Sequence, residues 1–251
     1  MNNRHPVIRI ATLVAASLFV LVSFSFPAAA ETINVDFSEG FGLTEQVVQI
    51  IALVTILSLA PSILVMVTSF VRIVVVLSLL RTALGVQQSP PNSVIISLSL
   101  FLTAFVMAPV FETAYETGIA PLLNEEIEIG EAFSHSSKPF HAFMLTQVRE
   151  KDLELFMDLS KTPTVESPED IPLHVMVPAF MISELRRAFE IGFLIFVPFI
   201  VIDLVVASVL MSMGMMMLPP IIISLPFKLI FFVLVDGWYL IAGSLVKSFG
   251  M

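Results

Sequence analysis

The chain has 251 residues, of which 57% are hydrophobic and 13% charged, and it contains no cysteine. The charged share is about half of that in soluble domains, so the composition excludes a disordered chain and an ordinary soluble domain. The net charge of −9 has the wrong sign for a protein that binds nucleic acid. We therefore expect an all-α, membrane-associated protein without disulfides or thiolate metal sites.

Residues 1–30 are predicted to be a cleaved signal peptide. A basic start is followed by an apolar stretch at residues 10–24 and by an alanine triplet at 28–30, which is typical of a cleavage site. The alternative is an uncleaved membrane anchor, but the apolar stretch is short for a span of about 20 residues. Cleavage would leave residues 31–46 as a short N-terminal extracytoplasmic segment.

Residues 47–111 are predicted to form a first hydrophobic helical hairpin region. Residues 46–71 contain no charge, and Pro61 within them predicts a kink, because proline removes a helical hydrogen bond. Arg72 follows on an otherwise apolar stretch. Residues 93–111 form a second charge-free run of membrane length.

Residues 112–177 differ in kind and are predicted to be an acidic, soluble, extracytoplasmic insertion. They hold thirteen acids and four bases, so their net charge of −9 equals that of the whole chain. Residues 140–159 are expected to form one amphipathic helix. Prolines indicate a loop at residues 166–172.

Residues 178–251 are predicted to form a second hydrophobic helical hairpin region. Its apolar segments at 193–218 and 221–246 bring the number of such segments after the signal to four, with broken, proline-kinked helices. A methionine-rich loop at 211–217 lies between them. Methionine is flexible, so this run predicts either a gap-filling helix end or a pliable seal formed by several copies around a pore.

Eight ionisable residues lie in or beside these apolar segments, where each charge costs about 2.5–3.5 kcal/mol on insertion. They are Arg72, Glu184, Arg186, Arg187, Glu190, Asp203, Lys228 and Asp236. One interpretation is a buried structural network of ion pairs; the other is an ion relay. Helical spacing would pair Arg186 with Glu190 and Arg187 with Glu184 or Glu190. Lys228 is expected to pair with an acid such as Glu184 or Asp203, in the same or an adjacent subunit.

No motif for nucleotide binding, metalloprotease chemistry or a nucleophile elbow occurs in the sequence. His135, His141 and His174 lack the spacing of metal ligands. We therefore predict a non-enzyme with no cofactor and no metal.

The stretch Pro-Ala-Phe-Met-Ile-Ser-Glu-Leu-Arg-Arg-Ala-Phe-Glu-Ile-Gly-Phe at residues 178–193 resembles the signature of the FliP family. These are the P proteins of the flagellar type III export gate, and they are similar to the R-type export-gate proteins of injectisomes. The resemblance covers roughly residues 45–250. Its supporting stretches are Phe70–Ile73, Arg81–Gly85, Gln87-Gln88, Pro90–Asn92, Leu225–Leu229 and Asp236–Trp238.

The resemblance implies an export-gate subunit in the bacterial inner membrane, at the flagellar basal body. Five copies would assemble with FliQ- and FliR-type subunits into a helical, pseudo-hexameric cone that contacts membrane lipid, alongside FlhB- and FlhA-type components. Met215, Met216 and Met217 would form the gasket that closes the pore, and the substrates would be unfolded protein subunits. The alternative function is a secondary transporter or ion channel that uses buried carboxylates as a relay, with Glu184, Glu190 and Asp203 as candidates.

Overall fold

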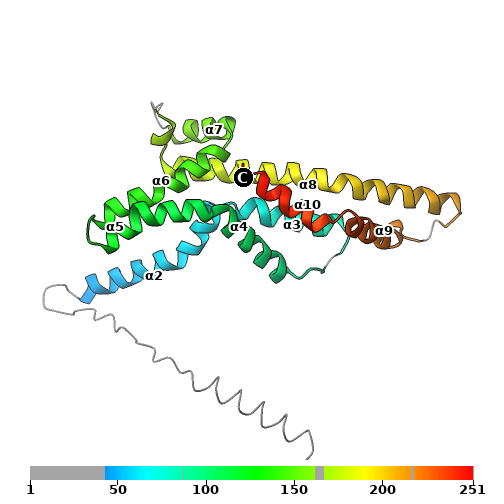
Figure 1. Cartoon of the computed structure of the whole chain (residues 1–251), viewed down its shortest axis with the longest axis horizontal. Helices are drawn as coiled ribbons and strands as arrows, with labels where there is room; N and C mark the ends of the chain where they lie inside the picture. The colour runs from blue at the N-terminus through cyan, green and yellow to red at the C-terminus, as the bar shows by residue number, and fades with distance from the viewer. Residues whose placement is uncertain (1–42, 87, 162–166, 216–217, 251) are drawn as a thin grey trace, which may run out of the picture. The chain divides into compact units, whose positions relative to one another are not determined.

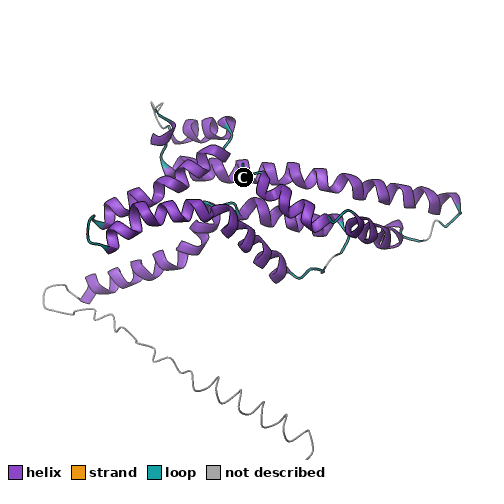
Figure 2. Cartoon of the chain, in the orientation of Figure 1, coloured by secondary structure: helices purple, strands orange, loops and turns teal. Residues whose placement is uncertain are grey.

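The structure is a computed structural model that describes residues 43–86, 88–161, 167–215 and 218–250. Every regular element within these ranges is a helix, in agreement with the predicted all-α class (Figure 2). The predicted signal peptide and most of the N-terminal segment lie outside the described residues. The chain divides after Leu53 into two units, and the first contributes the start of α2, with apolar side chains exposed. The elements are α2 (Leu43–Met66), α3 (Phe70–Ala83), α4 (Asn92–Ala114), the π-helix η1 (Tyr115–Ile119), α5 (Ala120–Leu123), α6 (Ile129–Gln147), α7 (Glu150–Ser160), the 3-10 helix η2 (Pro168–Asp170), α8 (Leu173–Ser212), α9 (Pro220–Leu234) and α10 (Gly237–Lys247).

Helix α3 forms the centre of the second unit. It packs against α8 and α4 (Figure 1), and Ile73, Val76 and Leu80 on it are fully buried. A helix that is apolar on most sides is stable only when neighbours cover it, and here they do. Gly192 on α8 permits the close approach, because a Cβ there would lie 2.3 Å from Leu79 Cδ1.

The longest element is α8, which joins two parts that the sequence separates. The charged stretch at 178–193 and the start of the apolar segment at 193–218 form one continuous helix, through Pro178 and Pro198. Proline is tolerated in membrane-type helices when neighbouring groups satisfy the backbone atoms that it frees. Helix α2 likewise continues through Pro61, and the helical run breaks later, at residues 67–69.

The predicted single helix at 140–159 is wrong, because α6 and α7 are separated at Val148 and Arg149. Both residues have extended backbone angles, and the backbone N–H of Arg149 donates to the hydroxyl of Ser183 at 3.1 Å. A contact with a distant helix therefore fixes the break. At the predicted loop, the described part from Ser167 contains the short helix η2.

Two described helices are long and apolar enough to cross a membrane, at Asn92–Leu123 and Leu173–Ser212. Two bent pairs, α2 with α3 and α9 with α10, raise the number to four if each pair counts as one span. This matches the four apolar segments in the sequence. The most apolar stretch of α8 is only 11% buried within the chain, so lipid or other subunits must cover it.

Candidate functional site

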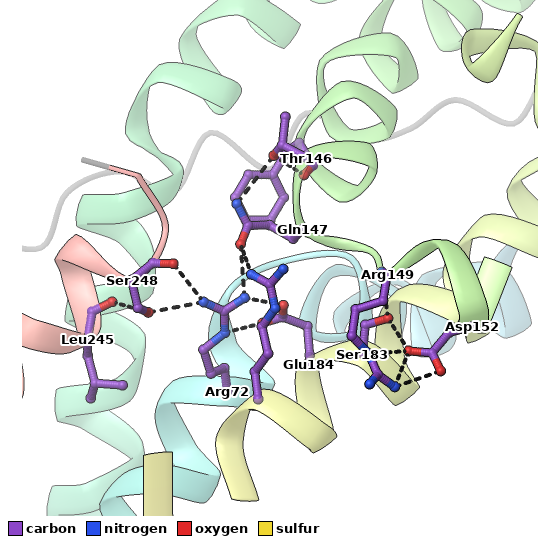
Figure 3. Close-up of polar contacts among 11 residues, drawn as sticks. Arg72, Thr146, Gln147, Arg149, Asp152, Ser183, Glu184, Leu245 and Ser248 are labelled. Atoms are coloured by element: carbon purple, nitrogen blue, oxygen red, sulfur yellow. Dashed lines mark hydrogen bonds and ion pairs between the residues drawn. The ribbon is translucent and has the colours of Figure 1, made fainter. Parts of the chain in front are cut away.

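Arg72 on α3 is fully buried, and its guanidinium group faces the equally buried carboxylate of Glu184 on α8 (Figure 3). Its Nε–H donates to Oε2 of Glu184 at 2.8 Å, and Nη2 pairs with Oε1. This two-pronged geometry matches the fork of arginine to the two carboxylate oxygens. The pair links two helices whose residues are 112 positions apart in the sequence.

The remaining donors of Arg72 are also satisfied. Nη2 donates to Oε1 of Gln147 at the end of α6, and Nη1 donates to the carbonyl and hydroxyl oxygens of Ser248, each at 3.0 Å. The guanidinium carbon lies 3.8 Å from the ring centre of Phe249, a cation–π contact. All five N–H groups therefore have acceptors, so one side chain joins α3, α6, α8 and the C-terminal residues after α10.

A second network lies one residue away on α8 and holds the start of α7 (Figure 3). The hydroxyl of Ser183 donates to Oδ2 of Asp152 at 2.6 Å, and Arg149 donates to both oxygens of that carboxylate at 2.7 and 2.8 Å. Burial raises the pKa of Asp152. The hydrogen bonds from Ser183 and Arg149, together with the charges of Arg149 and Arg186, lower this pKa by more than burial raises it. The pKa of this carboxyl group therefore lies below its ordinary value, and the ionised form stabilises the contact between α7 and α8.

A third network joins α8 and α9. Nζ of the buried Lys228 lies 2.7 Å from Oδ2 of Asp203, and the Ser224 hydroxyl donates to Oδ1 at 2.5 Å. The same Nζ donates to the carbonyl oxygen of Ala83 at 3.4 Å. Of the two acids that the sequence offered, the structure pairs Lys228 with Asp203 in the same chain, while Glu184 binds Arg72.

The other ionisable residues are more exposed. Arg186 and Glu190 form an i,i+4 ion pair at 2.8 Å with side chains 57% and 59% exposed, and Asp236 is exposed with a left-handed backbone before α10. These three are therefore not buried in the single chain. Arg187 was expected to pair with Glu184 or Glu190, but its Nη1–H donates instead to Oε1 of Gln147 at 3.1 Å.

These contacts bear on the relay interpretation. Each of the three carboxylates proposed for it, Glu184, Glu190 and Asp203, forms an ion pair with a base. A relay needs acids that pass a proton from one to the next, whereas each of these carboxylates lies against a base and not against another acid. The geometry thus favours the structural interpretation. Over the ranges that the structure describes, no group of three metal-ligating side chains comes together.

Helix α8 ends at the methionine-rich loop. The N–H of Met215 donates to the carbonyl of Leu210, and that of Gly214 donates to the carbonyl of Met211, at 3.0 and 3.1 Å. With Gly214 at φ +74°, this is a Schellman motif, an ordered helix end rather than a frayed one. Met211, Met213 and Met215 are 57%, 59% and 44% exposed. The other two predicted gasket residues, Met216 and Met217, lie outside the described residues.

Several residues of these networks carry no signal in the sequence. Gln147, Asp152, Ser183, Ser224 and Ser248 are ordinary polar or acidic residues, and four of them bind a charged group that lies 21 or more positions away in the chain. Ser183 lies inside the stretch that resembles the family signature. That stretch is the one feature that could have singled it out.

Comparison with known proteins identifies the family. The FliP family model matches residues 53–245. The flagellar biosynthetic protein FliP of Caulobacter vibrioides is 65% identical over 241 residues, which cover 94% of this chain and 91% of the relative. The FliP proteins of Bacillus subtilis and Aquifex aeolicus are 53% and 49% identical, covering 87% and 86% of this chain and 99% and 91% of theirs. The chain belongs to the FliP family.

Proposed function

We propose that this chain is a core pore-forming subunit of the flagellar type III protein export gate. It passes unfolded flagellar subunits across the bacterial inner membrane and is needed to build the flagellum. The names of its relatives, flagellar biosynthetic proteins, support the flagellar assignment. The proposed assembly has five copies of this chain, with FliQ- and FliR-type subunits and with FlhB- and FlhA-type components at the basal body.

The exposed apolar surface supports assembly into a complex. Helix α8 has 40 residues and is about 60 Å long, twice the ~30 Å of a bilayer core. Its exposed apolar side chains extend from Ile182 to Met211, about 44 Å of helix, which is longer than the bilayer core can cover. The exposed ion pair of Arg186 and Glu190 on the same helix also suits a protein neighbour better than lipid.

The observation that carries the pore proposal is the end of α8. An ordered Schellman motif presents exposed methionines at the tip of the longest helix. Methionine changes rotamer easily and fills irregular gaps. A ring of such loops, one from each copy, would close on itself at rest and still adapt to chains of varied sequence.

The test is a set of three variants of the full chain, co-expressed with its FliQ- and FliR-type partners. Native mass spectrometry first establishes that each variant still forms the multimer. Replacing Met215, Met216 and Met217 with alanine removes most of the sealing volume, so small solutes should leak through the membrane while some protein export persists. Replacement with leucine keeps the volume and should keep the seal.

Met66→Ala, an exposed methionine on α2, serves as the control and should not leak. Normal permeability of an intact triple-alanine multimer would place the seal elsewhere. Transport by the purified chain alone, without partners, would instead favour the transporter or channel.

A further inference from the structure

The hairpin formed by the end of α4, η1, α5 and the first half of α6 has small residues on its inner side. Figure 1 shows α6 running back along α4, with α5 at the turn. The hydroxyl of Ser136 donates to the carbonyl of Ala114 at 3.2 Å. A Cβ added at Gly118 would lie 2.7 Å from the carbonyl oxygen of Ala132. Because the arms lie this close, large side chains cannot fit between them.

The large apolar side chains of the hairpin are instead exposed at its closed end. Ile119, Leu123, Ile129 and Phe133 are 45%, 69%, 78% and 71% exposed, and we call them the tip residues. Each arm contributes two of them, four residues apart. A helical hairpin that functioned alone in water would bury such side chains between its arms. Their exposure therefore indicates a surface that another molecule covers.

The charge around the tip residues is mainly negative. Residues 112–138 contain six glutamates and one base, Lys138. All six are exposed: Glu112, Glu116, Glu125, Glu126, Glu128 and Glu131. A partner that covers the tip residues must therefore bring positive charge to the rim, or it would be repelled.

Lipid and a second copy both fit this surface poorly. Glu125, Glu126, Glu128 and Glu131 lie between or beside the tip residues in the sequence, so lipid tails that covered the tip residues would also meet carboxylates. Anionic lipid headgroups would repel the glutamates. The hairpin tip of a second copy carries the same glutamates, so two tips would also repel each other.

We propose that the hairpin tip docks a basic amphipathic helix of another protein. The apolar face of that helix covers the tip residues, and its lysines and arginines pair with the surrounding glutamates. The tip residues form two exposed apolar pairs, each with i,i+4 spacing, and such pairs provide the ridges against which a helix packs. This inference does not depend on the pore role of the methionine loop.

Photo-crosslinking in intact cells tests the partner. The full chain carries p-benzoylphenylalanine at Ile129 or at Phe133, and a control carries it at Leu159, a 68% exposed leucine on α7. We expect both tip positions, and not the control, to crosslink to one segment of a different protein. Mass spectrometry of the crosslinked peptide should show a net positive segment with apolar residues at helical spacing.

Charge reversal tests the electrostatic part. The double variant Glu125→Lys/Glu126→Lys should lower the tip crosslink by about tenfold, because it replaces two attractive charge contacts with repulsive ones. The matched reversal of two exposed acids on α7, Glu154→Lys/Asp158→Lys, should leave it unchanged. The proposal is overturned by crosslinks to lipid, to a second copy of this chain or to an acidic segment, by no crosslink above the control, or by equal effects of the two reversals.

Discussion

Arg72 shows how a charge is kept inside an apolar chain. All five of its N–H groups have acceptors and a phenylalanine ring covers its guanidinium group. A buried ion pair of this kind adds little net stability over apolar residues, but removing one partner costs about 3–5 kcal/mol. Its effect is therefore to favour the observed arrangement of helices, in which every donor of Arg72 has an acceptor.

We predict that Arg72→Lys destabilises the protein although the charge is kept. Lysine has three donors on one nitrogen and cannot reach Glu184, Gln147 and Ser248 together. Each buried group left unsatisfied costs about 1–3 kcal/mol. Thermal unfolding in detergent measures the loss. The control is Arg186→Lys in the exposed pair, and an equal effect of both changes would contradict the prediction.

The attachment of α7 to α8 should depend on pH through Asp152. Its pKa is lowered in the folded state, so its contribution is present above the pKa of the unfolded chain and is lost as pH falls through the folded pKa. Asp152→Asn should reduce the free energy of unfolding at pH 7, and the two proteins should converge in acid. Unfolding from pH 7 to pH 3 measures this, with the exposed Asp158→Asn as control. A constant difference across that range would refute it.

At the scale of the element, a single glycine allows two helices to approach each other closely. Gly118 lies in the π-helix, and a Cβ there would lie 2.7 Å and 2.9 Å from backbone atoms of Ala132 and Ser136. Backbone atoms cannot move aside as a side-chain end can, so the two arms would have to separate. A Cβ added at Gly130, in the same hairpin, would have no neighbouring atom within 4 Å.

Gly118→Ala should therefore loosen the hairpin by about 1–3 kcal/mol, as overpacking does. Limited digestion with a glutamate-specific protease, which cuts at the exposed acids Glu125 and Glu126, should proceed faster than in the natural chain. Gly130→Ala should leave the rate unchanged or slow it, because alanine favours a helix. Equal rates for the two variants would contradict the prediction.

Sequence patterns predicted where the helices lie better than they predicted which helices contact one another. Apolar runs, two of them without any charge, marked the four apolar segments, and i,i+4 spacing indicated the pair of Arg186 and Glu190. The pairing of Arg72 with Glu184 could not be predicted, because spacing carries no information beyond one helix. The break between α6 and α7 was missed for the same reason: the hydroxyl that satisfies its backbone comes from Ser183 on another helix.

At the scale of the whole molecule, the ion pairs determine how the helices of the second unit pack. Lys228→Ala would leave Asp203 and the Ala83 carbonyl without their partner, at a cost of about 1–3 kcal/mol. We expect a lower yield of the multimer in native mass spectrometry. The swap Asp203→Lys/Lys228→Asp should restore part of it, whereas Lys151→Ala, at an exposed lysine on α7, should have little effect. A Lys228→Ala variant that assembles fully but does not export would revive the relay interpretation.

The contacts of Arg72 also have a consequence for synthesis in the cell. Glu184 follows it by 112 residues and Ser248 by 176. At roughly 5–20 residues per second, the ribosome needs about 10–35 seconds to make the last of these partners. Throughout that interval the nascent chain holds an arginine on an apolar helix without its full set of native acceptors. The second unit can therefore close around Arg72 only after residue 248 has been made, and a chain released before that residue lacks the group that satisfies Nη1.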